Sequence, residues 1–175
     1  MRTITLSMSS ATPVNKQALT EIYERYSPDI FRYARRLLDD GDLAEDCVAD
    51  TFHRFLIAVR AGTSIENQRA YLYRTAHNWI TDHYRRRPPP SISLEDDVHT
   101  DPEGNPSQLV AQEMERQRMR AALLQLSLEQ RQVIELRYLE NLSHFEVAAV
   151  LGKTVEATRA LQYRAMETLR QIFAE

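Results

Sequence analysis

The chain has 175 residues, of which 43% are hydrophobic, and it carries four glycines and a net charge of −3. This composition is typical of a soluble helical protein, and no apolar run is long enough to cross a bilayer. The single cysteine, Cys47, excludes an internal disulfide and favours the reducing cytoplasm as the compartment.

The N-terminal residues lead into a long amphipathic helix. Residues 1–15 lack the apolar core of a signal peptide, and we expect them to form a mobile tail. A helix is predicted over residues 16–38, where Pro28 should kink or break it. The face predicted to be buried carries Leu19, Ile22, Tyr23, Tyr26, Ile30, Tyr33, Ala34 and Leu37.

A second helix is predicted from Asp42 to about Arg60, and its two faces differ in character. The face that should be buried carries Ala44, Val48, Thr51, Phe52, Phe55 and Val59. The opposite stripe consists of Asp46, Asp50, His53 and Ile57. Exposed acids beside an aliphatic residue indicate a docking surface for a basic partner. A solvated face with scattered aliphatic residues is the alternative that the pattern leaves open.

After a short turn or helix near residues 63–68, a third long helix is predicted to run to Arg87. Its inward face carries Leu72, Tyr73, Ala76, Ile80 and His83. Its outward stripe carries Tyr71, Arg74, Asn78, Thr81 and Arg85, with Trp79 on one flank and Arg86 and Arg87 closing the helix. Arginines can bind phosphates, and aromatic rings can stack on bases, so this stripe is suited to a nucleic-acid strand. Ordinary C-terminal capping by cations explains the last arginines equally well.

An acidic segment separates the two helical halves of the chain. Residues 88–108 begin with three prolines and contain five acidic residues but no Lys or Arg. Such a segment cannot bury enough apolar surface to fold alone, so we expect a flexible linker. The predicted fold class is therefore all-α, with one small helical domain over residues 16–87 and another over residues 109–175.

The second half ends in a predicted helix-turn-helix. Helices are expected near residues 109–126 and 128–139, and Ser127 and Gln130 form a capping box that opens the second of them. Ser143 and Glu146 form a further capping box that opens another helix. Gly152 should end that helix, and Thr154 should begin the last one. The inward face of the last helix carries Thr158, Leu161, Ala165 and Leu169. The opposite face carries Glu156, Arg159, Ala160, Tyr163, Glu167 and Arg170, a polar stripe that could enter a major groove.

Three segments in this order resemble an extracytoplasmic-function sigma factor of the sigma-70 family. The docking helix of that family is similar to residues 42–59, DLAEDCVADTFHRFLIAV. Its minus-ten recognition helix is similar to residues 69–87, RAYLYRTAHNWITDHYRRR. The start of its second domain is similar to residues 126–151, LSLEQRQVIELRYLENLSHFEVAAVL. The resemblance covers nearly everything from Leu19 to Ile172.

The resemblance implies a role for each surface. The stripe from Asp46 to Ile57 would dock on the core RNA polymerase clamp, and the stripe from Tyr71 to Arg86 would bind the melting minus-ten element. In the minus-thirty-five major groove, Glu156, Arg159 and Tyr163 would face the bases, where Arg159 would read guanine and Glu156 would accept from cytosine. The residues that would hold phosphates there are Lys153, Thr154, Arg164 and Arg170. The acidic linker would thread the RNA channel of the polymerase, or it is an inert spacer. An anti-sigma factor is an expected further partner.

Two other functions remain as alternatives. A free-standing helix-turn-helix regulator would bind a duplex operator without polymerase, but it leaves the Tyr71–Arg85 stripe unexplained. An enzyme is disfavoured, because the histidines show no metal-ligand spacing and there is no glycine-rich phosphate loop or nucleophile elbow. We therefore expect no catalytic residue, no metal site and no cofactor.

Overall fold

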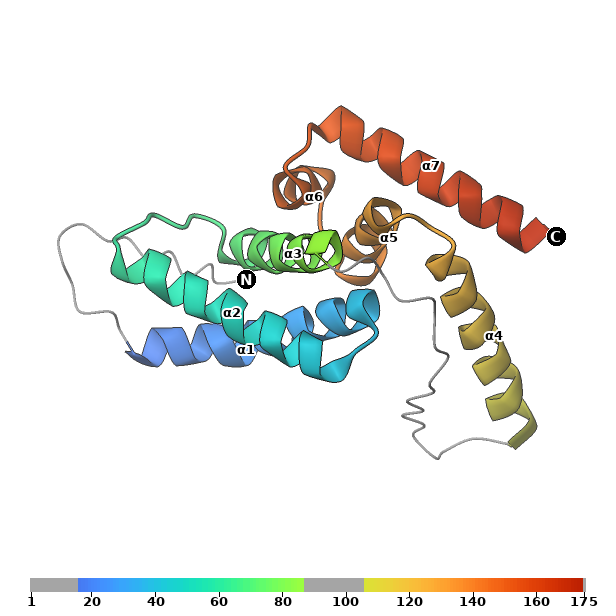
Figure 1. The fold of residues 1–175 in the computed structure, drawn as a ribbon, viewed down its shortest axis with the longest axis horizontal. Helices are drawn as coiled ribbons and strands as arrows, with labels where there is room; N and C mark the ends of the chain where they lie inside the picture. Colours follow the sequence, from blue (N-terminus) through green and yellow to red (C-terminus); the bar gives the residue numbers. More distant parts are fainter. Residues whose placement is uncertain (1–15, 87–105, 175) are drawn as a thin grey trace.

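The computed structural model describes residues 16–86 and 106–174, and every regular element in these ranges is helical (Figure 1). The expected mobile tail and most of the acidic linker lie outside the described residues. The chain belongs to the all-α class, as its amphipathic patterns predict.

The first half packs α1 (Lys16–Leu38), α2 (Gly41–Arg60) and α3 (Gln68–Arg86) against one another (Figure 1). The α1 helix runs through the exposed Pro28 without interruption, so the predicted break does not occur. Buried side chains on both sides of the proline, Ile22 and Ile30, anchor the helix to the core and offset the lost backbone hydrogen bond.

Tyr23 was predicted to be buried and is instead 49% exposed. Its ring meets the edge of Phe52 with the ring centroids 4.8 Å apart, so it covers the rim of the core rather than entering it. Residues 61–67 form a loop and not a helix, and the Asn67 side chain accepts a hydrogen bond from the Ala70 backbone N–H at 2.9 Å as α3 begins.

The second half contains α4 (Pro106–Leu124), α5 (Leu128–Ile134), the π-helix η1 (Glu135–Leu139), α6 (His144–Leu151) and α7 (Val155–Ala174). The α4 helix begins inside the range assigned to the linker. The capping boxes at Ser127 and Ser143 are confirmed, and Gly152 has a φ of 64° at the end of α6. The predicted helix over residues 128–139 is correct in extent, but its last turn is π-helical.

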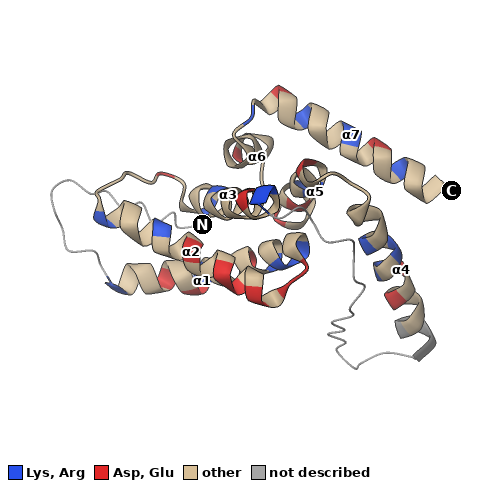
Figure 2. Cartoon of the chain, viewed as in Figure 1, with Lys and Arg blue, Asp and Glu red and all other residues tan. Residues whose placement is uncertain are grey.

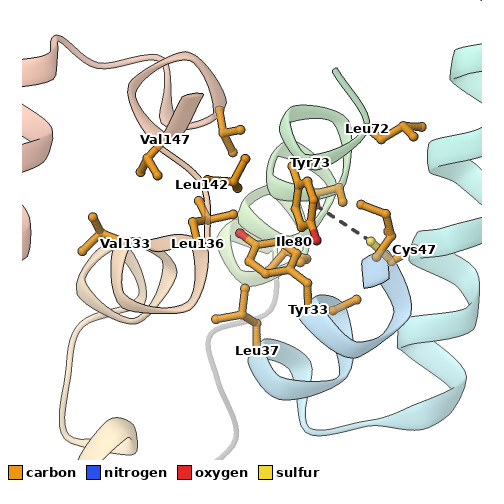
Figure 3. Close-up of a cluster of buried hydrophobic side chains, with 14 of the residues drawn as sticks. Tyr33, Leu37, Cys47, Leu72, Tyr73, Ile80, Val133, Leu136, Leu142 and Val147 are labelled. Atoms are coloured by element: carbon orange, nitrogen blue, oxygen red, sulfur yellow. Dashed lines mark hydrogen bonds between the residues drawn. The ribbon is translucent and has the colours of Figure 1, made fainter. Parts of the chain in front are cut away.

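The two halves pack directly against each other, mainly through α3 and α6. Their buried side chains form one continuous cluster, in which Tyr73 and Ile80 of the first half lie near Leu136 and Leu142 of the second (Figure 3). Polar contacts cross the boundary as well, including a hydrogen bond from the Gln132 amide to the Thr81 hydroxyl at 3.3 Å. The sequence patterns contain no signal for this contact.

Candidate functional site

The outward stripe of α2 lies opposite the residues that anchor the helix. Because Ala44, Cys47, Val48 and Phe55 are buried, Asp46 and His53 are held in solvent, and Ile57 is 53% exposed. Asp50 is half-buried and forms an ion pair with Arg54 at 2.5 Å. Acidic residues gather over the first part of α2 (Figure 2). The structure therefore presents the four predicted docking residues along one side of one helix.

Most of the predicted minus-ten residues line a single groove between α2 and α3. The groove has a volume of about 660 Å³, and its walls include Tyr71, Arg74, Asn78, Trp79 and Arg86. The core fixes the orientation of α3, and so of the side chains that line the groove. On the opposite side of α3, the fully buried residues are Leu72, Tyr73, Ala76 and Ile80. A groove that combines cations, an amide and aromatic rings can hold the backbone and bases of a single strand.

Arg85 does not line this groove. Its guanidinium forms an ion pair with the Asp82 carboxylate at 2.6 Å, one turn back on the same helix. His83, which was predicted to face inward, is half-buried, and its ring stacks on Trp79 with centroids 5.5 Å apart and an interplanar angle of 7°. The histidine therefore extends the aromatic surface of the groove instead of filling the core.

Arg54 and Leu43 of α2 also line the groove, and the sequence patterns did not single them out. Arg54 is separated from Arg74 by the loop between two helices, so no periodicity within one helix relates them. In the sequence, Arg54 is only a cation beside the docking stripe. Its place in the groove follows from the packing of α2 against α3.

The α7 helix separates its two faces as predicted. Thr158, Leu161, Ala165 and Leu169 are buried, and the residues exposed on the other side are Glu156, Arg159, Tyr163, Arg164 and Arg170. Tyr163 is 67% exposed. Arg170 also forms an ion pair with Glu167 at 3.1 Å.

Lys153 and Thr154, the two residues before α7, each contact another part of the chain. The Thr154 hydroxyl accepts a hydrogen bond from the Ala157 backbone N–H at 3.1 Å, so it caps the helix as predicted. The Lys153 ammonium lies 3.0 Å from the Glu129 carboxylate of α5. Lys153 must exchange this partner for a phosphate if it is to contact DNA.

In the described ranges, no group of three or more potential ligand side chains could hold a metal ion. Among the same residues, no helix has the length and apolar character that crossing a membrane requires. His77 on the inward side of α3 is buried, and that burial lowers its pKa to about 4.

The fold and these surfaces define a two-part helical protein that ends in a helix-turn-helix. Comparison with family models places residues 22–88 in sigma-70 region 2 and residues 122–171 in sigma-70 region 4. The two matches together span more than half of the chain. The chain therefore belongs to the sigma-70 family, in the class of extracytoplasmic-function sigma factors.

Two ECF RNA polymerase sigma factors are relatives of this chain. The extracytoplasmic-function (ECF) RNA polymerase sigma factor BldN of Streptomyces coelicolor is 30% identical over 90% of this chain, which spans 61% of the length of BldN. The ECF RNA polymerase sigma factor SigL of Mycobacterium tuberculosis is 29% identical, and the match covers 96% of each chain.

Two solved structures are similar along most of the chain. CnrH, in complex with the cytosolic domain of CnrY, has a TM-score of 0.68 and 25% identity, with 91% of this chain and 90% of that chain covered. The sigma factor RpoE of Bartonella quintana, in complex with the anti-sigma factor NepR, has a TM-score of 0.70 at 21% identity, with 90% and 98% covered. The similarity to RpoE shows that the two proteins share a fold.

Proposed function

We propose that this chain is a promoter-specificity subunit that binds core RNA polymerase and directs it to a minus-ten and a minus-thirty-five element. The observation that carries the proposal is the groove between α2 and α3, where Arg74, Asn78 and Trp79 meet Arg54 from the neighbouring helix. A duplex reader needs only an exposed helix such as α7, whereas a groove with aromatic walls suits an unpaired strand.

The other surfaces take complementary roles in this proposal. The α2 stripe of Asp46, Asp50, His53 and Ile57 binds a basic surface of the polymerase, and residues 88–108 link region 2 (16–87) to region 4 (109–175). On α7, Glu156, Arg159 and Tyr163 read base edges, while Arg164 and Arg170 bind phosphates. The protein acts in the cytoplasm with polymerase, and its role is recognition without catalysis of its own.

An inhibitory partner is also part of the proposal. RpoE was solved in complex with the anti-sigma factor NepR, and CnrH was solved in complex with the cytosolic domain of CnrY. Both share the fold of this chain. We expect this chain to bind an anti-sigma factor through the same α2 and α3 surfaces that meet polymerase and DNA. The exposed acidic stripe on α2 requires a partner with a basic contact surface.

The test combines polymerase binding with run-off transcription from a randomised promoter library. The double variant Asp46→Arg/Asp50→Arg should lose co-elution with core polymerase and should give no specific transcript, because it places positive charge against a basic partner. Its matched control is Glu21→Arg/Glu24→Arg, which makes the same change at exposed positions on α1 and should behave as wild type. Far-UV circular dichroism verifies that both variants are folded.

Unchanged polymerase binding in the α2 variant would remove the docking surface from the proposal. A tight footprint by the chain alone, without polymerase, would support a free-standing helix-turn-helix regulator instead.

A further inference from the structure

Two arginines and a histidine meet at one corner of the helix-turn-helix. Arg137 of η1, His144 of α6 and Arg159 of α7 come from three different elements, and the charges of both arginines act on the imidazole. We call these three residues the basic corner. Of the three, the sequence patterns assigned only Arg159 to DNA.

Hydrogen bonds fix the geometry of the basic corner. Arg137 donates to the backbone carbonyl of Leu142, just before α6 begins. The neighbouring Tyr138 hydroxyl accepts from the Gln162 amide at 2.8 Å, which ties the same turn of η1 to α7, three residues after Arg159. The fold therefore holds the basic corner together.

The positive charge of the basic corner is not compensated. Within the described ranges, neither Arg137 nor Arg159 forms an ion pair with a carboxylate. The acidic residue of α6, Glu146, accepts from the Asn67 amide at 3.4 Å and is acted on by Arg69 of α3, so its charge is engaged toward the first half. Uncompensated cations in a chain with a net charge of −3 indicate an anionic partner.

Two nitrogen atoms of the basic corner lack hydrogen-bond partners. The Nε atom of Arg137 and the Nδ1 atom of His144 are buried, and neither bonds to any described residue. Buried polar atoms in native proteins are nearly always satisfied, and an exception is expected where an ion completes the site. Both side chains are only half-buried as a whole, so a small rotation presents them to an incoming anion.

The place of the basic corner in the fold selects the anion. Arg159 and Tyr163 are exposed on the face of α7 that we propose to read base edges, and the basic corner borders this face. When a recognition helix enters a major groove, the helix before it crosses the sugar-phosphate backbone. A duplex on α7 therefore brings a phosphate to Arg137 and His144, and both side chains are suited to charge-assisted hydrogen bonds with phosphate oxygens.

Given the proposed function, we propose that Arg137 and His144 bind one backbone phosphate of the minus-thirty-five duplex, and that this contact makes promoter binding tighter when His144 is protonated. The site is additional to the phosphate contacts proposed for Arg164 and Arg170. A phosphate contact carries no sequence information, so it adjusts the affinity and leaves the choice of promoter sequence unchanged.

The sign of the pH effect follows from the surroundings of the imidazole. Desolvation, reinforced by the charges of Arg137 and Arg159, lowers the pKa of His144 in the free protein. A bound phosphate adds negative charge and raises that pKa, so the complex takes up a proton that the free protein does not hold. Affinity is therefore highest below the pKa of the free protein and falls as pH rises through the pKa of the complex.

The test measures promoter binding by holoenzyme, reconstituted from core polymerase and the full chain, between about pH 6 and pH 8. The promoter is one selected from the randomised library. We expect wild type to bind about five- to tenfold more tightly at the acid end, as a pKa difference of about one unit requires. His144→Gln should bind at every pH as wild type does at the alkaline end. The other histidines titrate in both proteins, so their effects cancel in the difference.

The matched control is Arg118→Gln, which removes a positive charge from an exposed position on α4 and should keep the wild-type pH profile. Arg137→Gln should weaken binding about fivefold or more and reduce the salt dependence by about one counterion. It serves as a second variant if His144→Gln fails to fold, as judged by circular dichroism.

A second series replaces each phosphate of the minus-thirty-five element, one at a time, with an uncharged methylphosphonate. At one position this replacement should abolish the difference between wild type and His144→Gln, as a double-mutant cycle requires for a direct contact. The effect of Arg137→Gln should disappear at the same phosphate.

Parallel pH profiles for wild type and folded His144→Gln would overturn the proposal. A difference that persists with every methylphosphonate would overturn it as well, because the histidine would then act on the fold alone. In both cases wild-type holoenzyme still binds the promoter, so the proposed function stands. If wild-type holoenzyme binds no promoter at any pH, the proposed function fails and the phosphate contact fails with it.

Discussion

His77 illustrates how one buried residue responds to both halves of the molecule. It lies on α3 and is 9% exposed, and its Nδ1 atom has no hydrogen-bond partner among the described residues. Burial lowers its pKa to about 4, Glu129 opposes this effect, and Lys153 and Arg74 reinforce it. Glu129 and Lys153 come from the second half, so the neutral state of His77 depends partly on the contact between the halves.

The pKa of His77 predicts a loss of stability in mild acid. The unfolded histidine titrates near pH 6.5 and the folded one near pH 4, so the unfolded state binds more protons between these values. Wild type should therefore lose about 2–3 kcal/mol of unfolding free energy as pH falls from about 6.5 to about 4, at about 1.4 kcal/mol per unit of pKa difference.

His77→Gln removes this titration and should flatten the pH dependence by the same amount, as measured by urea unfolding at several pH values. Glu135 and the other acids titrate in both proteins, so their effects cancel in the difference. Parallel curves for the two proteins would show that His77 is not the group responsible.

At the scale of single elements, the helix-turn-helix depends on its caps. The Ser143 hydroxyl accepts from the Glu146 backbone N–H at 3.2 Å, and the Glu146 carboxylate accepts from the Ser143 N–H at 2.8 Å. Together they satisfy donors that the first turn of α6 leaves free. Both contacts involve residues three apart, which explains why the sequence alone predicted them.

Ser143→Ala should destabilise the protein by about 1 kcal/mol, because one capping acceptor is lost. For a chain of this size we expect the melting temperature to fall by about 2–4 °C, measured by scanning calorimetry. The matched control is Thr20→Ala in the interior of α1, where the hydroxyl bonds to the Lys16 carbonyl and alanine has the higher helix propensity. An equal loss in both variants would rule out capping as the cause.

At the scale of the whole molecule, the charges of each half are close to balanced. Residues 16–87 carry twelve basic and eleven acidic side chains, and residues 109–175 carry nine of each. Few counterions are released when such surfaces meet DNA, so the binding of DNA by the chain alone should be weak. In the proposed function, core polymerase supplies the DNA affinity that the chain lacks.

We therefore expect the isolated chain to give no footprint on a promoter duplex at physiological salt, while the holoenzyme protects both elements. Nuclease footprinting of the chain, core polymerase and the mixture on one DNA fragment measures this difference. Protection of both elements by the chain alone would contradict the argument from the nearly balanced charge of each half.

The sequence by itself determined the helices, their caps and most of their inward faces, with Tyr23 and His83 as exceptions. The Ser127 and Ser143 boxes, the end of α6 at Gly152 and the buried side of α7 all depend on residues within one or two turns. Local hydrogen bonding and helical periodicity decide such features, and both can be read along the chain. The α2 stripe and most of the α3 stripe follow in the same way, as the faces opposite the buried ones.

Only the tertiary structure decided what depends on distant residues. The groove needs Arg54 beside Arg74, α1 survives Pro28 because both flanks are packed, and His83 turns outward to stack on Trp79. Arg36 forms an ion pair with Glu135 across 99 positions, and the π-helical turn that begins at Glu135 has no signal in the helical periodicity. Packing brings these groups together, and the free energy of pairing buried charges depends on that proximity.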